Sequence, residues 1–235
     1  MVIFFFVFEA TLVLMYFLVY YWGSKLYKIR SGFYLFMFTI IGSLQLLIGI
    51  IFLLMIAGST NLIVLENFHF SVNQQKLFAL LWYIGFGIKI PLFPFHGWLP
   101  EVHAEASTAG SVVLAGILLK LGIYGIIRFG STVFPYGILY LGPGIFLCTL
   151  IGSFTCAYNC LRHYDLKKIV AYSSVVHMNF GMASFFTLHI QGLMGCICTS
   201  VSHGLCSGGL FMFLGFLYDR THSRNLFTLQ ALFHQ

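Results

Sequence analysis

Long, uninterrupted runs of hydrophobic residues dominate the chain, and short polar stretches separate them. Residues 31–65, 129–161 and 169–218 contain no Asp, Glu, Lys or Arg. Each run exceeds the roughly 20 residues with which an α-helix crosses a bilayer. Hydrophobic positions do not alternate with polar ones, as they do in the strands of a membrane β-barrel. The pattern therefore predicts an all-α, polytopic membrane protein.

Seven membrane-spanning helices are predicted from these apolar runs. Turn-forming residues such as Ser31-Gly32 and Gly58-Ser59-Thr60-Asn61 fall between neighbouring spans. Neither a linker nor a block of charge divides the sequence, so we expect one transmembrane domain over residues 1–235. The predicted spans cover residues 2–22, 33–57, 77–97, 108–129, 136–160, 168–188 and 192–217.

Composition excludes the soluble classes of protein. Only 8% of the residues are charged and 60% are hydrophobic, whereas an ordinary soluble domain is about 25% charged. So few charges cannot cover a soluble core, which excludes a soluble enzyme, a DNA-binding domain and a disordered tail. The six cysteines show no CxxC spacing, so buried free thiols are favoured over a metal site.

Basic residues are distributed unevenly between the predicted loops, which indicates an orientation. Loops on the cytoplasmic or matrix side carry an excess of Lys and Arg, and this bias accounts for the net charge of +6 without a nucleic-acid partner. The loops on one side hold only Lys76 and Arg128. The other side is therefore expected to be the inside, and it holds Lys25, Lys28, Arg30, Arg162, Lys167, Lys168, Arg220 and Arg224.

The third predicted span is irregular, because Pro91, Pro94 and Pro100 fall within ten residues after Lys89. Each proline removes a backbone donor and clashes with the preceding helical turn. One interpretation is a broken helix that lines a wet cavity, since irregular backbone is tolerated in a bilayer only there or inside protein. The other is a helix that ends at the interface, with Trp98 as an aromatic anchor.

Five ionisable residues lie inside predicted spans: Glu9, Lys89, Lys120, His177 and His203. At a rise of about 1.5 Å per residue, the last four lie about 14–18 Å from a membrane surface, close to the middle of a hydrocarbon core about 30 Å thick. A charge at that depth costs about 2.5–3.5 kcal/mol and usually marks an ion path or a proton relay.

Lysine, glutamate and histidine are suited to a relay. Burial brings the pKa values of lysine and glutamate toward neutrality, and histidine already titrates near it. Structural interpretations remain open: a lysine can extend to an interface, Glu9 can join two helices, and His177 and His203 can bond Ser173, Ser174 or Ser202. Haem ligation by the two histidines is disfavoured because no other feature of a haem pocket is present.

The segment from Lys89 to Gly125, KIPLFPFHGWLPEVHAEASTAGSVVLAGILLKLGIYG, resembles chain 4 of proton-translocating NADH:ubiquinone oxidoreductase, respiratory complex I. Further similarity lies at Phe8-Glu9-Ala10-Thr11, at Ser173 to His177, at Ser202-His203-Gly204 and at 219–224. HGWLPEVHAEAS distinguishes this family from the antiporter-like chains 2 and 5.

The resemblance implies a membrane-arm, antiporter-like subunit of the mitochondrial inner membrane. It implies that Glu9 pairs with Lys89 on the broken helix that contains Pro91 and Pro94. It also implies that Lys120 is the connecting lysine of the relay and that His177 and His203 lie on a central polar axis. The family subunit itself holds no flavin, iron–sulfur cluster or primary quinone site. Its partners are other membrane-arm subunits, including chains 2 and 5, and lipids.

Two departures from the family pattern matter. The family has about fourteen helices, in two inverted repeats, and this chain has about half of that length, so we expect a second chain to supply the missing helices. Ser107 replaces the usual proline, and Ser107 or Thr108 can cap the next helix. The alternatives to a proton-pumping complex I subunit are a subunit of a related cation/proton antiporter and a remnant that does not pump.

Overall fold

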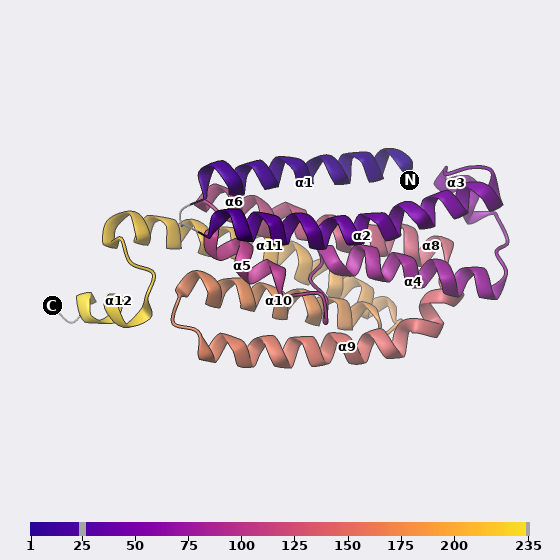
Figure 1. The fold of residues 1–235 in the computed structure, drawn as a ribbon. Helices are drawn as coiled ribbons and strands as arrows, with labels where there is room; N and C mark the ends of the chain where they lie inside the picture. Colours follow the sequence, from indigo (N-terminus) through magenta and orange to yellow (C-terminus); the bar gives the residue numbers. More distant parts are fainter. Residues whose placement is uncertain (24–26, 234–235) are drawn as a thin grey trace.

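The computed structural model describes residues 1–23 and 27–233, so Lys25, predicted for the inside, lies outside the described residues. The described chain is a helical bundle without a β-sheet (Figure 1). Its elements are α1 (Val2–Trp22), α2 (Lys28–Ala57), α3 (Leu62–Glu66), α4 (Val72–Lys89), α5 (Trp98–Glu105), α6 (Thr108–Val113), the π-helical η1 (Leu114–Leu118), α7 (Leu119–Gly125), the π-helical η2 (Ile126–Gly130), α8 (Ser131–Val133), α9 (Pro135–Arg162), α10 (Leu166–Phe185), α11 (Ile190–Thr221) and α12 (Leu226–Phe233).

The long helices run up and down between two ends of the bundle (Figure 1). The N-terminus and α3 lie at one end, and α12 lies at the other. The amino group of Met1 donates to the carbonyl of Thr60 at 3.1 Å, which fixes the start of α1 beside the α2–α3 connection. One end of the bundle holds the α1–α2 connection, the α9–α10 connection and the last turns of α11. It is called the basic end below. It carries the described Lys and Arg residues predicted for the inside.

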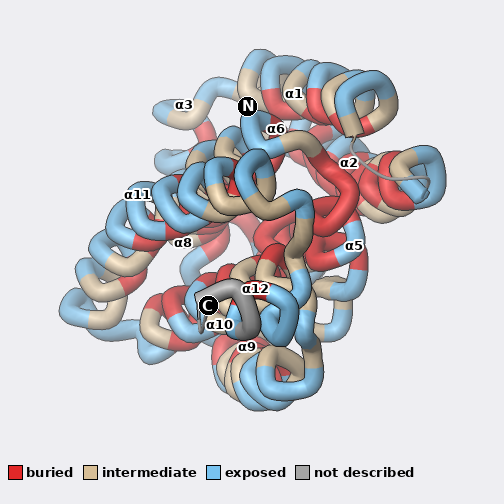
Figure 2. The backbone as a smooth tube through the Cα atoms, turned by 90° about the vertical axis from the view of Figure 1, so that its left-hand side faces the viewer, coloured by how far each residue is buried: buried red, intermediate tan, exposed pale blue. Residues whose placement is uncertain are grey.

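Five segments of the described chain are long and apolar enough to cross a membrane, which confirms a multi-pass protein. They are α1, α2, the continuous segment Thr108–Val133, α9 and α11. The other two predicted spans correspond to α4 and α10, which run along the same axis but contain more polar residues. Large apolar side chains such as Ile3, Leu161 and Leu205 point outward and are 77–83% exposed. Figure 2 shows the buried residues on the helix sides that face one another.

Two predicted boundaries were wrong. Ser31-Gly32 is not a turn but lies in the first turns of α2, where a Cβ at Gly32 would contact the Tyr16 ring of α1 at 3.5 Å. Helices α1 and α2 are therefore in contact at this point. The third span begins at Val72 rather than at residue 77, because Ser71 and Gln74 form a reciprocal capping box at its start.

The third predicted span is a broken helix, as one of the two interpretations proposed. Helix α4 ends at Lys89, and α5 resumes at Trp98. Trp98 is only 4% exposed, and its indole Nε1 donates to the Ile88 carbonyl at 2.9 Å. The alternative, an interfacial Trp98 anchor, is therefore wrong, since the ring lies inside the bundle and satisfies a carbonyl that the break frees.

Candidate functional site

Glu9 and Lys89 form an ion pair between α1 and the broken helix. Lys89 Nζ lies 2.7 Å from Glu9 Oε1, and the two side chains are 9% and 24% exposed. The ammonium also lies 3.4 Å from the centre of the Phe8 ring, a cation–π distance. Lys89 is the last residue of α4, where the partial negative charge of the helix C-terminus favours a cation.

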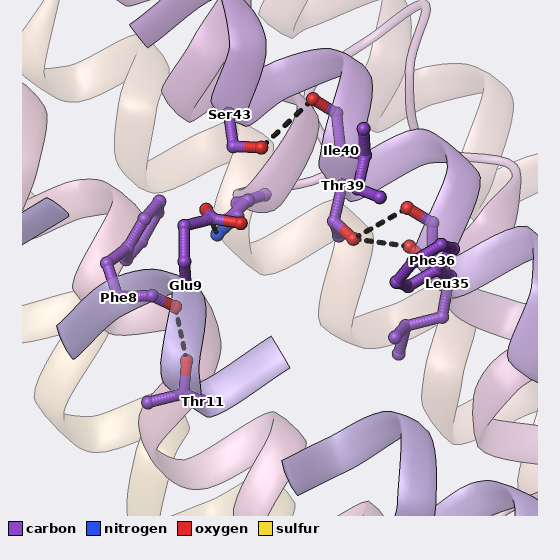
Figure 3. Close-up of polar contacts among 9 residues, drawn as sticks. Phe8, Glu9, Thr11, Leu35, Phe36, Thr39, Ile40 and Ser43 are labelled. Carbon is purple, nitrogen blue, oxygen red and sulfur yellow. Dashed lines mark hydrogen bonds and ion pairs between the residues drawn. The ribbon is translucent and has the colours of Figure 1, made fainter. Parts of the chain in front are cut away.

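Hydroxyl groups of α1 and α2 surround Glu9 (Figure 3). Thr11 donates to the Phe8 carbonyl, and Ser43 donates to the Ile40 carbonyl. Thr39 likewise donates to carbonyls of its own helix. Because each of these hydroxyls donates its proton to a backbone carbonyl, its oxygen can only accept a hydrogen bond from another donor.

Asn179 of α10 holds the unwound segment 90–97 in place. Its amide nitrogen donates to the Pro91 carbonyl at 3.2 Å and to the Val175 carbonyl at 2.9 Å. Its amide oxygen accepts from the backbone N–H of Phe93 at 3.4 Å. Asn179 is fully buried, and it satisfies a buried carbonyl and a partly buried N–H that the break leaves without helical partners. Sequence reasoning missed this residue, and the available signal was a lone amide within an apolar span.

Lys120 and His203 form a second pair, between α7 and α11. Lys120 Nζ lies 2.8 Å from His203 Nδ1, and it also donates to the Ala115 carbonyl. Ala115 lies in the π-helical η1, whose altered hydrogen bonding leaves carbonyls for such contacts. A Cβ at Gly204 would lie 3.2 Å from the Gly116 carbonyl oxygen. The two glycines therefore let α11 approach η1 and place His203 against Lys120.

His177 lies beside the second pair and not beside the first. Its ring centre is 5.7 Å from that of His203, and the two planes are tilted by 49°. His203 is 7% exposed and its Nε2 is buried without a hydrogen-bond partner, whereas His177 is exposed on the bundle surface. Ser173, Ser174 and Ser202, the serines of the structural interpretation, donate to backbone carbonyls of their own helices rather than to either histidine.

A small cavity of about 40 Å³ lies beside Lys89. Its lining is mostly apolar, apart from Lys89, Thr11 and Thr39, and includes Leu119 and Leu121, the sequence neighbours of Lys120. A cavity of this size holds a water molecule where polar partners are present. Ser107 caps α6 by accepting from the Gly110 N–H, as the sequence predicted, and so fixes the start of the helical segment that carries Lys120.

Comparisons with known proteins agree with this arrangement. NADH-ubiquinone oxidoreductase chain 4 of Marchantia polymorpha is 44% identical over 224 residues, which are 95% of this chain and 45% of that protein. The fold is similar to a chain of respiratory complex I from Thermus thermophilus with bound NADH, with a TM-score of 0.87, 26% identity and coverage of 96% and 48%. It is also similar to a chain of the Mrp complex from Dietzia sp. DQ12-45-1b, with a TM-score of 0.83, 25% identity and coverage of 94% and 24%.

The chain spans about 45% of the length of that chain 4 relative. The family described as "NADH:quinone oxidoreductase/Mrp antiporter, TM" matches residues 1–235. A buried lysine on a broken helix and a half-buried lysine beside a π-helix, each with an ionisable partner, thus lie in a fold shared with these proteins. The chain belongs to the NADH:quinone oxidoreductase/Mrp antiporter family of transmembrane proteins.

Proposed function

We propose that this chain is part of a proton-translocating, chain 4-type subunit of NADH:ubiquinone oxidoreductase in the mitochondrial inner membrane. Protons move through Glu9, Lys89, Lys120, His203 and His177 while electrons pass from NADH to ubiquinone in other subunits. Those subunits supply the flavin, iron–sulfur clusters and quinone site. The observation that carries the proposal is the presence of two lysine-centred pairs, at 2.7 and 2.8 Å, inside one apolar bundle.

The strength of such pairs suits them to control a proton. Two unit charges at about 4 Å interact by about 4 kcal/mol at an effective dielectric constant of 20. Moving one charge through 100 mV requires about 2.3 kcal/mol. Breaking or forming the Glu9–Lys89 pair therefore changes the energy of a proton by more than a membrane potential of that size does.

The proposal includes a partner that covers the face of His177. A polar ring that faces lipid is costly, and His177 is exposed on this bundle. Helices from a neighbouring chain or membrane-arm subunit, such as the antiporter-like chains 2 and 5, would bury it and extend the relay beyond His203.

A cation/proton antiporter is the second candidate, because the fold is also similar to a chain of an Mrp complex, with a TM-score of 0.83 against 0.87 for the complex I chain. The two candidates differ in the source of energy. The first consumes NADH, and the second exchanges protons for Na⁺ without NADH. A remnant that does not pump would assemble with an NADH-oxidising complex and leave its proton yield unaffected by changes in this chain.

The test uses the native assembly that contains this chain, isolated and placed in liposomes. Glu9→Gln and Lys120→Ala are expected to lower the number of protons moved per NADH oxidised, with the redox centres retained. Glu66→Gln, which changes a carboxylate on the exposed α3, is the matched control and is expected to have no effect. Unchanged pumping in Glu9→Gln and Lys120→Ala would contradict the relay. Na⁺/proton exchange without NADH oxidation would favour the antiporter.

A further inference from the structure

His103 has no role in the relay described so far, yet its surroundings are unusual. It lies on α5, the half of the broken helix that leads to the basic end, and is 0% exposed. Both ring nitrogens are buried without a hydrogen-bond partner in the described residues. Unpaired polar atoms in a protein interior are rare and costly, so they need an explanation. Its ring stacks on that of Phe211, with centres 4.5 Å apart and planes 5° apart.

The groups that act on His103 come from three other elements of the bundle. His103 lies within electrostatic range of Lys167 on α10, of His203 on α11 and of Lys120 on α7. Two of these three groups form the second pair of the relay. The third, Lys167, is 6% exposed and lies at the first turn of α10, at the basic end. His103 thus lies between the basic end and the middle of the relay.

The basic end is open to solvent beside these groups. A groove of about 740 Å³ is lined by Glu105, the last residue of α5, together with Glu101, Lys168, Arg30 and other polar or aromatic residues. A smaller cavity of about 20 Å³ is lined by Lys167, Arg224 and Phe211, the ring on which His103 stacks. The groove therefore extends along α5 to Glu105, two residues from His103, and the smaller cavity lies beside its stacking partner.

Cations of α10 and of the segment after α11 stabilise this end of α5. Lys167 Nζ donates to the Ala106 carbonyl at 2.5 Å, and Arg224 donates to the Ala104 carbonyl at 2.7 Å. Such contacts satisfy the last carbonyls of the helix and complement its dipole. They also hold the backbone on both sides of Glu105, two residues after His103.

We propose that His103 carries protons from the aqueous groove at the basic end, past Lys167, to the Lys120–His203 pair. This proposal rests on the proposed proton-translocating function and adds an access route to it. The transported species is a proton delivered by water. One ring nitrogen of His103 accepts this proton, while the other can release a proton toward the Lys120–His203 pair. Only N–H and O–H bonds form or break in this transfer. The stack on Phe211 keeps the ring between the two ends of the route.

The test replaces His103 by Phe in the native assembly in liposomes. Phenylalanine keeps the aromatic stack and removes both unpaired nitrogens, so a purely structural histidine predicts equal or higher thermal stability and unchanged pumping. The proposal predicts equal or higher stability together with a loss of proton pumping similar to that of Lys120→Ala. His103→Gln introduces a polar side chain that does not titrate at neutral pH. We expect this variant to pump as poorly as His103→Phe.

His96→Phe is the matched control. His96 also stacks on a phenylalanine, Phe93, and also has a buried nitrogen without a partner, but it lies on the unwound segment and outside the route. It is expected to leave pumping unchanged. The proposal would be overturned by normal pumping in His103→Phe or in His103→Gln. Failure of both variants to assemble would also overturn it. Normal pumping in Lys120→Ala would instead overturn the relay on which it rests.

Discussion

Asn179 illustrates what a single side chain does in this fold. The break after Lys89 leaves backbone groups without helical partners inside an apolar bundle, and one amide group satisfies the carbonyl of Pro91 and the N–H of Phe93. The same amide also donates to the Val175 carbonyl, and a hydroxyl group, which has one donor, cannot make all three bonds. Asn179 is therefore structural, and its effect on the relay passes through the position of Lys89.

Replacing Asn179 by Ala is expected to destabilise the protein. The substitution removes the partners of the buried Pro91 carbonyl and of the partly buried Phe93 N–H, and an unpaired buried group costs about 1–3 kcal/mol. The thermal midpoint of the assembly measures this effect. Asn67→Ala is the control, since Asn67 is exposed and caps only the short α3. An equal midpoint for the two variants would contradict the role given to Asn179.

At the scale of elements, the contact between η1 and α11 determines how Lys120 and His203 meet. Gly116 and Gly204 face each other there, and a Cβ at Gly204 would lie 3.4 Å from Lys120 Cε. Similar close approaches occur between α2 and α4, where a Cβ at Gly42 would lie 2.9 Å from the Gly85 carbonyl oxygen. Small residues thus bring together helices whose polar side chains must touch.

Gly204→Val is expected to separate Lys120 from His203 and to lower proton pumping per NADH while the bundle stays folded. The branched side chain forces η1 and α11 apart, and overpacking of this kind costs about 1–3 kcal/mol. Gly209→Val on the same helix is the control, because nothing lies within 4 Å of a Cβ there. Pumping assays on both variants make the comparison. Equal pumping would show that the close contact is not needed.

Much of the arrangement of the helices could be predicted from the sequence. Unbroken apolar runs defined the long helices, and the prolines after Lys89 indicated the break. The pairing of Lys89 with Glu9 followed from a family resemblance, since no local pattern relates residues 80 positions apart. The π-helical segments, the Asn179 contacts and the burial of Trp98 were not predicted. They depend on neighbours that only the folded bundle brings together.

At the scale of the whole molecule, the two ends of the bundle differ in charge. The described basic residues gather at one end, with Lys28, Lys168 and Arg220 on three different helices. Lys76 lies at the opposite end, where its ammonium sits 3.8 Å from the centre of the Tyr140 ring. By the positive-inside rule, the basic end faces the matrix or cytoplasm.

Cysteine labelling tests this orientation. In sealed, right-side-out membranes, an impermeant thiol reagent is expected to label Asn67→Cys and not Arg220→Cys, because the two exposed positions lie at opposite ends. The unmodified chain gives the background from the native thiols, of which Cys198 and Cys206 are exposed on the outer surface of the bundle. Labelling of Arg220→Cys alone would reverse the orientation, and with it the side on which the groove opens.

The attachment of segment 90–97 to α10 has a thermodynamic consequence. Asn179, which holds the segment after Lys89, and His177, which neighbours His203, are two residues apart on the same rigid helix. If the segment shifts when the Glu9–Lys89 pair gains or loses a proton, α10 offers a route by which that shift reaches the second pair. Linkage then requires reciprocity: the change in proton affinity that the first pair imposes on the second equals the change that the second imposes on the first.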